Sequence, residues 1–384
     1  MKLILFANTD WYLYNFRQSL AVALVGAGHD VLLVSPPGSY GEKLRALGFR
    51  WEPAPMKRNS LNPVRELALL FWLWRLVRAE RPDLVHSFTV KSAVYGALVA
   101  RVCGAARVSA VAGMGYVFIS DAPKARILRP FVRLLMRLVL GGKRARLILQ
   151  NPDDVDLFIH AGLVPKEQIR LIPGSGVNCD LFQPPRVARS KESNEELRIV
   201  LAARMLWDKG IGEFVEAARR LHAENRPLKF ILAGDPDPGN PAAISESTLR
   251  DWQAEGLVEW LGHVDDMPTL LAGADMVVLP SYREGLPKTL IEAAACARPL
   301  VTCDVPGCRH AVRDGVDGLL VPARDAKALA RAIAKLQDDP ELAAKLGNAA
   351  RLRALNEFEE RIVIARTIAI YNELVNEDGT PAAR

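Results

Sequence analysis

The sequence predicts an α/β protein made of two domains, each with a parallel sheet covered by helices. Its 384 residues exceed the size of one ordinary domain, which is about 100 to 200 residues. Short apolar runs rich in β-branched residues alternate with longer helical patterns, as expected for βαβ units. Residues 173–196 are rich in proline, glycine and charge, and they separate two sets of such runs. This segment is typical of an interdomain linker.

The predicted strands follow from the apolar runs in chain order. In the first half they are 2–7, 30–34, 83–86, 107–112 and 146–149. In the second half they are 197–203, 229–233, 257–260, 275–279, 299–302 and 318–321. The predicted domains are 1–180 and 190–357, with the boundary near 180 to 190 and a helix at about 358–377. Because ligands bind at the carboxyl ends of strands in open parallel sheets, functional residues are expected directly after strands.

Composition excludes several classes of protein. Half of the residues are apolar and a quarter are charged, which is typical of a globular chain. The apolar run at the N-terminus is too short for a signal sequence, and no uncharged stretch approaches the roughly 20 residues of a membrane span, so a cytoplasmic protein is expected. The five cysteines form no C-x-x-C pair and their spacings fit no zinc pattern, which predicts reduced thiols and no metal site.

The charge is distributed unevenly between the two halves. Residues 1–185 contain 24 Lys and Arg against 13 Asp and Glu, whereas residues 186–384 contain 26 against 31. A basic first half indicates association with an anionic surface such as phospholipid or nucleic acid. Because no nucleic-acid recognition motif accompanies the charge, nucleic acid is not an expected partner.

Two glutamates follow a predicted strand of the second half. Pro287 suits the first turn of a helix, so Glu284 falls in the loop before it and Glu292 lies inside it. A carboxylate accepts two hydrogen bonds and matches a vicinal diol, which suits Glu292 to ribose hydroxyls and Glu284 to a sugar ring. Backbone N–H groups around Gly285 and Leu286 can bind a phosphate or a hydroxyl. Taken alone, the pattern also fits a solvent-facing helix.

Two cations follow the predicted strand 197–203. Arg204 and Lys209 can flank a diphosphate and offset the charge that it gains when its bond to a sugar breaks. As single residues they also fit ordinary surface cations. A further predicted strand, 229–233, ends at Gly234.

Together these motifs resemble the signature of the family-4 retaining glycosyltransferases, which have the GT-B fold of two Rossmann-like domains with parallel sheets facing across a cleft. The resemblance implies a nucleotide-sugar donor such as a UDP-sugar, no cofactor and no metal, because Arg204 and Lys209 replace the metal. Asp235-Pro-Asp237 is therefore interpreted as a loop and not as a D-x-D metal motif. The helix at about 358–377 resembles one that crosses back to the first domain. The implied catalytic residues are Arg204, Lys209 and Glu284, and the implied donor-binding residues are Gly234, Val264, Gly285, Leu286 and Glu292.

The first half resembles a subgroup of that family that acts on lipid-linked oligosaccharide precursors. Three segments, 6–17, 86–91 and 112–118, carry this resemblance. A histidine that is common in the family after the strand at 107–112 is absent, so His86 is either a substitute for it or a structural histidine. The acceptor-side candidates are Asn15, Arg17, His86, Lys91 and Gly113.

Residues 122–146 contain eight basic residues and no acid. A helix there would carry a cationic stripe beside apolar side chains, which fits either a membrane interface or a core helix whose arginines face water. The aromatic run 71–74 adds to the membrane interpretation. The four arginines of the stripe are Arg126, Arg129, Arg133 and Arg137.

The expected function is retaining, metal-independent transfer of a hexose or N-acetylhexosamine from a UDP-sugar to a polyprenyl-diphosphate-linked saccharide. The enzyme would be peripheral to the cytoplasmic face of the cell membrane and would bind its anionic surface. One alternative is a UDP-sugar 2-epimerase of the same fold, for which no additional acid/base cluster is found. The other is a non-enzymatic nucleotide-sugar-binding membrane protein.

Overall fold

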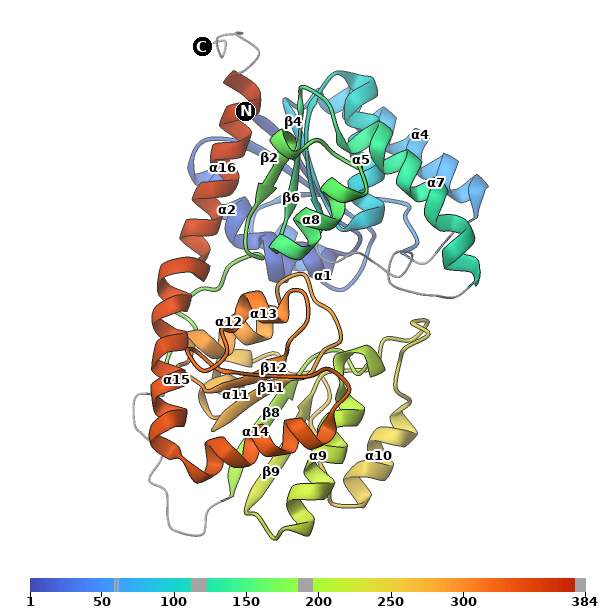
Figure 1. The fold of residues 1–384 in the computed structure, drawn as a ribbon. Coiled ribbons are helices and arrows are strands. Elements are labelled where there is room, and N and C mark those ends of the chain that lie inside the picture. The colour runs from blue at the N-terminus through green and yellow to red at the C-terminus, as the bar shows by residue number, and fades with distance from the viewer. Residues whose placement is uncertain (59, 61, 112–122, 186–195, 377–384) are drawn as a thin grey trace. The chain divides into compact units, whose positions relative to one another are not determined.

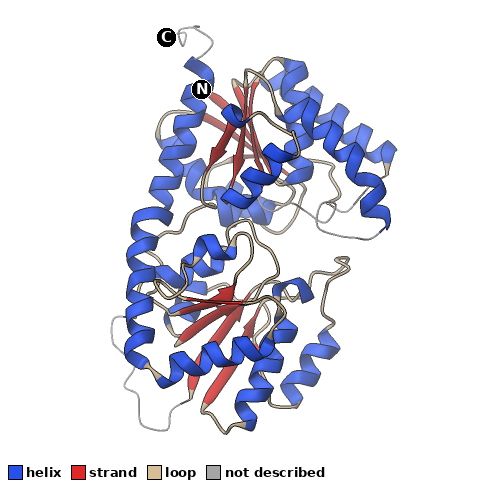
Figure 2. Cartoon of the chain, in the orientation of Figure 1, coloured by secondary structure: helices blue, strands red, loops and turns tan. Residues whose placement is uncertain are grey.

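The computed structural model divides into two compact units, each with a parallel sheet flanked by helices (Figure 1, Figure 2). Unit 1 comprises residues 1–175 and 363–384, and unit 2 comprises residues 176–362. The division falls between Ser175 and Gly176, a few residues before the expected boundary. The structure describes residues 1–58, 60, 62–111, 123–185 and 196–376; the side chains of 123–129, 131 and 376 are not described.

The sheet of unit 1 has seven parallel strands in the order β3-β2-β1-β4-β5-β6-β7. All five predicted strands are present, with ends shifted by at most two residues. The edge strands β3 and β7 were not predicted, because they are short and carry no apolar run. The strands are β1 (Lys2–Phe6), β2 (Asp30–Ser35), β3 (Arg50–Pro53), β4 (Leu84–Phe88), β5 (Ala106–Val111), β6 (Ala145–Leu149) and β7 (Ile169–Leu171).

Helices cover both faces of this sheet, and α4, α5 and α7 lie side by side on one face (Figure 1). The start of α4 is fixed by Asn62, whose side chain accepts hydrogen bonds from the N–H groups of Val64 and Arg65. The helical segments are α1 (Asp10–Tyr12), the π-helix η1 (Leu13–Arg17), α2 (Gln18–Gly26), α3 (Gly41–Ala46), α4 (Pro63–Glu80), α5 (Val90–Cys103), α7 (Pro123–Leu140), α8 (Pro152–His160) and η2 (Lys166–Gln168).

The sheet of unit 2 has six parallel strands in the order β10-β9-β8-β11-β12-β13, and all six were predicted. The strands are β8 (Leu197–Ala202), β9 (Leu228–Ala233), β10 (Glu259–Trp260), β11 (Met276–Leu279), β12 (Leu300–Cys303) and β13 (Leu319–Val321). The helical segments are η3 (Trp207–Lys209), α9 (Ile211–Ala223), α10 (Glu246–Ala254), α11 (Met267–Ala272), α12 (Lys288–Ala295), α13 (Cys308–Ala311), α14 (Ala326–Asp338), α15 (Pro340–Arg353) and the π-helix η4 (Ala354–Phe358).

In unit 2, most positions of the central strand β8 are apolar because both of its faces are buried. In β8, Ile199 and Leu201 belong to one core cluster, while Val200 and Ala202 belong to the cluster on the other face. Parallel sheets covered on both sides require this continuous apolar pattern.

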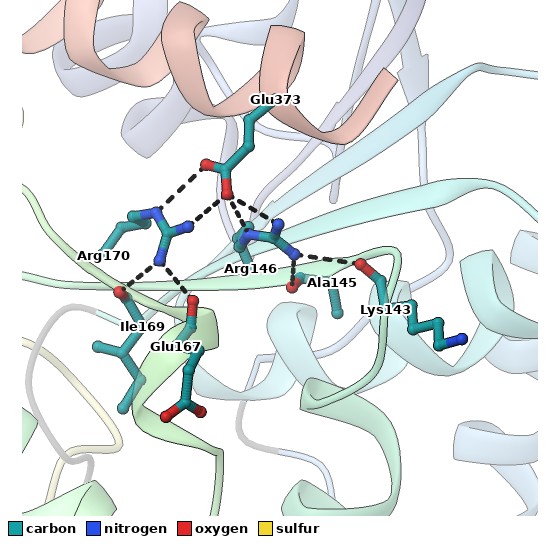
Figure 3. A network of polar contacts seen from close by, with 7 residues as sticks. All are labelled: Lys143, Ala145, Arg146, Glu167, Ile169, Arg170 and Glu373. Atoms are coloured by element: carbon teal, nitrogen blue, oxygen red, sulfur yellow. Dashed lines mark hydrogen bonds and ion pairs between the residues drawn. The ribbon is translucent and has the colours of Figure 1, made fainter. Parts of the chain in front are cut away.

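The last helix, α16 (Glu360–Asn376), is attached to unit 1 by a carboxylate between two arginines (Figure 3). Arg146 on β6 donates to Glu373 Oε1 from two nitrogens, at 2.9 and 2.8 Å. Arg170 on β7 also donates to both oxygens of Glu373. Burial raises the pKa of Glu373, but these hydrogen bonds outweigh it and hold the pKa below its ordinary value.

We expect Glu373→Gln to destabilise unit 1 by about 2 kcal/mol, because Arg146 is 7 % exposed and would lose the carboxylate that it binds in Figure 3. Thermal and urea unfolding would measure the change. Asn372→Ala, one residue earlier on the exposed side of α16, is the matched control and should be nearly neutral. Equal stabilities of the two variants would contradict the proposed role of this network.

Candidate active site

The carboxyl ends of neighbouring strands in unit 2 are joined by close backbone contacts. Gly234 follows β9 with φ +135°, and a Cβ there would lie 1.9 Å from the carbonyl oxygen of Ala203. Its N–H donates to the carbonyl of Gly262 at 2.7 Å, which ties it to the loop after β10. A Cβ on Gly210 would likewise lie 2.1 Å from the carbonyl oxygen of Pro280. Only glycine allows the backbone at positions 210 and 234 to pass this close to the neighbouring carbonyl groups. These contacts hold the loops after β8, β9, β10 and β11 together at one edge of the sheet.

At this edge Lys209 and Glu284 form an ion pair. Lys209 Nζ lies 2.5 Å from Glu284 Oε1, and both side chains are mostly buried. Ser281 Oγ donates to the same carboxylate oxygen at 2.6 Å. The N–H of Glu284 donates to the carbonyl of Pro306 at 3.0 Å. The sequence did not identify Ser281 as a partner, although it lies in the same motif.

Arg204 is paired with Asp237. Its Nη1 lies 2.5 Å from Asp237 Oδ2; the Arg204 side chain is 49 % exposed and that of Asp237 is 16 % exposed. Residues 235–237 lie in the loop after β9. The pairing with Arg204 was not predicted.

Glu292 lies in the second turn of α12 and is buried. Lys288 Nζ is 3.6 Å from its Oε1. Burial raises the pKa of Glu292, and Lys288 partly opposes this shift. Pro287 occupies the N-cap position of α12 and not its first turn, and the Thr289 hydroxyl donates to the carbonyl of Ala202 at 2.9 Å. The start of α12 is thereby attached to the end of β8.

The remaining donor-side candidates occupy the same strand ends. Gly285 and Leu286 are buried between Glu284 and the start of α12, and Val264 is half-buried after β10. The structure therefore brings the loops that carry most of the predicted donor-side residues, together with the start of α12, to one edge of the unit 2 sheet.

Two of the acceptor-side candidates of unit 1, Arg17 and His86, both lie against the ring of Phe88. Arg17 ends the π-helix η1 and is 5 % exposed, with its guanidinium 4.4 Å from the ring of Phe88. His86 on β4 is 1 % exposed, and its Nδ1 shares a 2.5 Å hydrogen bond with the hydroxyl of Tyr371. Burial, with a smaller contribution from Arg17, lowers the pKa of His86 well below its ordinary value. This burial favours the structural interpretation of His86.

Other acceptor-side candidates have local partners. Lys91 Nζ donates to the carbonyls of Lys57 and Ser60 and to Glu66 Oε1, so its donors stabilise the loop before α4. Asn15 donates to the carbonyl of Trp11 at 3.0 Å. Gly113 lies outside the described residues.

On α7 the four arginines of the predicted stripe are only partly described. Arg133 and Arg137 are exposed, together with Leu134, Leu135 and Leu138. The side chains of Arg126 and Arg129 lie outside the described residues. Val139 is buried with Met136 and Leu140 against α5.

Two α/β units, each with a parallel sheet, fit the GT-B fold of glycosyltransferases, and comparisons with known proteins place the chain in that class. Residues 15–174 match the family described as "Glycosyl transferase 4-like domain", and residues 196–339 match "Glycosyl transferases group 1". The structure of HepE from Anabaena in complex with UDP has the same fold, with a TM-score of 0.76 at 19 % identity over 97 % of this chain and 100 % of that one.

Two curated relatives extend the comparison. An N,N'-diacetylbacillosaminyl-diphospho-undecaprenol α-1,3-N-acetylgalactosaminyltransferase of Campylobacter jejuni is 29 % identical over 98 % of this chain and 99 % of its own length. A UDP-Gal:α-D-GlcNAc-diphosphoundecaprenol α-1,3-galactosyltransferase of Escherichia coli is 25 % identical over 75 % of each chain. The protein belongs to the family-4 (group 1) glycosyltransferases, a retaining family, and the predicted fold class and enzyme class are confirmed.

Proposed function

We propose that the protein transfers a hexose or N-acetylhexosamine from a UDP-sugar to a saccharide carried on a polyprenyl diphosphate. The observation that carries the donor side is that the loops with Arg204, Lys209 and Glu284 and the start of helix α12, which carries Glu292, meet at one edge of the unit 2 sheet. The names of the two relatives, which act on undecaprenyl-diphosphate-linked sugars, support the acceptor class. The UDP complex of HepE supports the choice of nucleotide.

In the proposed reaction, Arg204 and Lys209 bind the donor diphosphate and stabilise the negative charge that develops as it leaves. Glu284 binds sugar hydroxyls, and Glu292 binds the ribose. The bond from the sugar C1 to the diphosphate oxygen breaks while a bond to the acceptor oxygen forms on the same face. The acceptor hydroxyl proton passes to the departing diphosphate, so no protein base is required.

Arg17 is the strongest candidate in unit 1 for binding the acceptor diphosphate. Its described contacts are a hydrogen bond to the Tyr12 hydroxyl at 3.0 Å and the ring of Phe88, with no carboxylate among the described residues. Its Nε is buried without a hydrogen-bond partner in the described part of the chain. A buried guanidinium without a counter-charge is costly, and a phosphate would neutralise it.

The test is transfer between defined substrates. Purified protein is incubated with a panel of UDP-hexoses and UDP-N-acetylhexosamines and with short polyprenyl-diphosphate-linked acceptors, and products are identified by mass spectrometry. A product heavier by one sugar, with the anomeric configuration of the donor, is expected. Conversion of the UDP-sugar to an isomer without acceptor would overturn the proposal.

We also propose that the protein binds an anionic membrane surface through α7. The described part of this helix exposes Leu134, Leu135 and Leu138 beside Arg133 and Arg137. Apolar side chains next to cations are suited to the headgroup region of a membrane. In the described residues, no helix is both long and apolar enough to cross a bilayer. Peripheral binding at the cytoplasmic face would bring the enzyme to a lipid-linked acceptor.

The double substitution Arg133→Gln and Arg137→Gln is expected to weaken binding to phosphatidylglycerol-containing vesicles by about tenfold to thirtyfold, since each cation contributes about 1 kcal/mol. Liposome flotation would measure it, with phosphatidylcholine vesicles as the uncharged reference. Arg219→Gln with Arg220→Gln on α9 removes the same charge from unit 2 and serves as the control. Equal flotation of both double variants would end the membrane proposal.

A further inference from the structure

Both cations at the candidate donor site are paired with carboxylates, but the two pairs differ. The carboxylate of Glu284 belongs to the proposed donor-binding residues. Asp237, which pairs with Arg204, has no role in the proposed reaction and lies in the loop after β9. This difference raises the question of what Asp237 does when a diphosphate binds Arg204.

The position of Asp237 is fixed by backbone hydrogen bonds between two loops. Met205 N donates to the carbonyl of Asp235 at 2.9 Å, and Ile244 N donates to the carbonyl of Met205 at 2.9 Å. Trp207 N donates to the carbonyl of Ala242 at 2.8 Å. The loops that carry Asp237 and Arg204 are therefore held against each other, so their pairing follows from the backbone.

A carboxylate and a phosphate cannot share one guanidinium without opposing each other. Asp237 Oδ2 accepts a hydrogen bond from Nη1 of Arg204. The same Nη1 group is one of the donors that a diphosphate would use. Any phosphate bound to the remaining donors would lie close to the Asp237 carboxylate, and like charges at that separation repel. The pair is half-exposed on the arginine side, so it is weak enough to be exchanged.

We propose that Asp237 is an electrostatic latch: its carboxylate occupies Arg204 in the empty site, is displaced by the donor diphosphate, and returns as the nucleotide product leaves. This inference rests on the proposed function, since it concerns the same donor site. It makes Asp237 a positioning residue that weakens nucleotide binding and assists product release. It also gives residues 235–237 a function that requires no metal.

The experiment is a double-mutant cycle on UDP binding, measured by calorimetry in metal-free buffer. Asp237→Asn is expected to tighten UDP binding by about threefold to fivefold, because it removes a competing charge of the strength of an exposed ion pair. Arg204→Gln should weaken binding, and Asp237→Asn should have no further effect in that background. The gain should shrink at about 1 M salt. Glu255→Gln, which removes one exposed charge on the same unit, is the control and should leave the affinity unchanged.

The outcomes separate the latch from the proposed function. If neither the wild-type protein nor any variant binds UDP, the proposed donor site is wrong. If UDP binds and Arg204→Gln weakens it, but Asp237→Asn binds UDP equally or more weakly, only the latch is overturned. If Mn²⁺ tightens UDP binding to the wild-type protein and not to Asp237→Asn, Asp237 is a metal ligand and the latch is likewise overturned.

Discussion

Lys209→Met is expected to lower the rate constant of sugar transfer by about two to three orders of magnitude while unit 2 stays folded. The lysine is held in place by Glu284, and its ammonium is largely shielded from water. A fixed cation in such a position stabilises a leaving diphosphate more strongly than a mobile surface cation does. Because this charge develops mainly in the transition state, the loss should appear in kcat more than in the KM for the donor.

The measurement is a steady-state transfer assay with varied donor, accompanied by circular dichroism and thermal unfolding. Lys229→Met is the matched control, since Lys229 on β9 makes an exposed pair with Glu259. Its activity should equal that of the wild type. A folded Lys209→Met variant with wild-type kcat would show that Lys209 has no part in transfer.

Gly234→Ala is expected to destabilise unit 2 by about 2 to 4 kcal/mol and to disturb the donor site. Two effects add, because the residue has a positive φ and because the new Cβ would overlap the carbonyl oxygen of Ala203. Relief requires the loops after β8 and β9 to separate. Those loops carry Arg204 and Asp237, so nucleotide binding should weaken together with stability.

Gly256→Ala separates the two effects. Gly256 also has a positive φ, but no atom lies within 4 Å of the position of its Cβ. Its substitution should cost only about 1 kcal/mol, from backbone strain alone. Urea unfolding of both variants would measure the difference. Equal costs would mean that the contact between Gly234 and Ala203 is not what holds these loops together.

The central strands of unit 2 could be predicted because they are buried on both faces and bounded by loops with strong sequence signals. The edge strands of unit 1 could not be predicted in the same way. Arg50–Pro53 and Ile169–Leu171 are short, and their pairing depends on neighbours that are distant in sequence. Local sequence patterns indicate which face of a strand is buried, and an edge strand buries too little surface to produce a clear pattern.

The donor-side residues could be predicted from motifs, but their partners could not. Asp237 lies far from Arg204 in sequence, and only the pairing of β8 with β9 brings their loops together. Lys91 follows a strand, as expected for a ligand-binding residue in a parallel sheet. Its ammonium nevertheless donates to the carbonyls of Lys57 and Ser60 and to the carboxylate of Glu66. A position directly after a strand identifies candidate ligand-binding residues. Which of them are available to a ligand depends on their partners in the tertiary structure.

The last helix has a consequence for the order in which the chain folds. Tyr371 and Leu374 on α16 are buried in the same core cluster as Leu3 and Leu5 on the first strand. Ribosomes deliver N-terminal segments first, and domains usually fold as they emerge. The core of unit 1 is complete only after α16 has been translated, because Tyr371 and Leu374 are part of it. Unit 2 can therefore complete its own core before unit 1 does, although residues 176–362 are translated after residues 1–175.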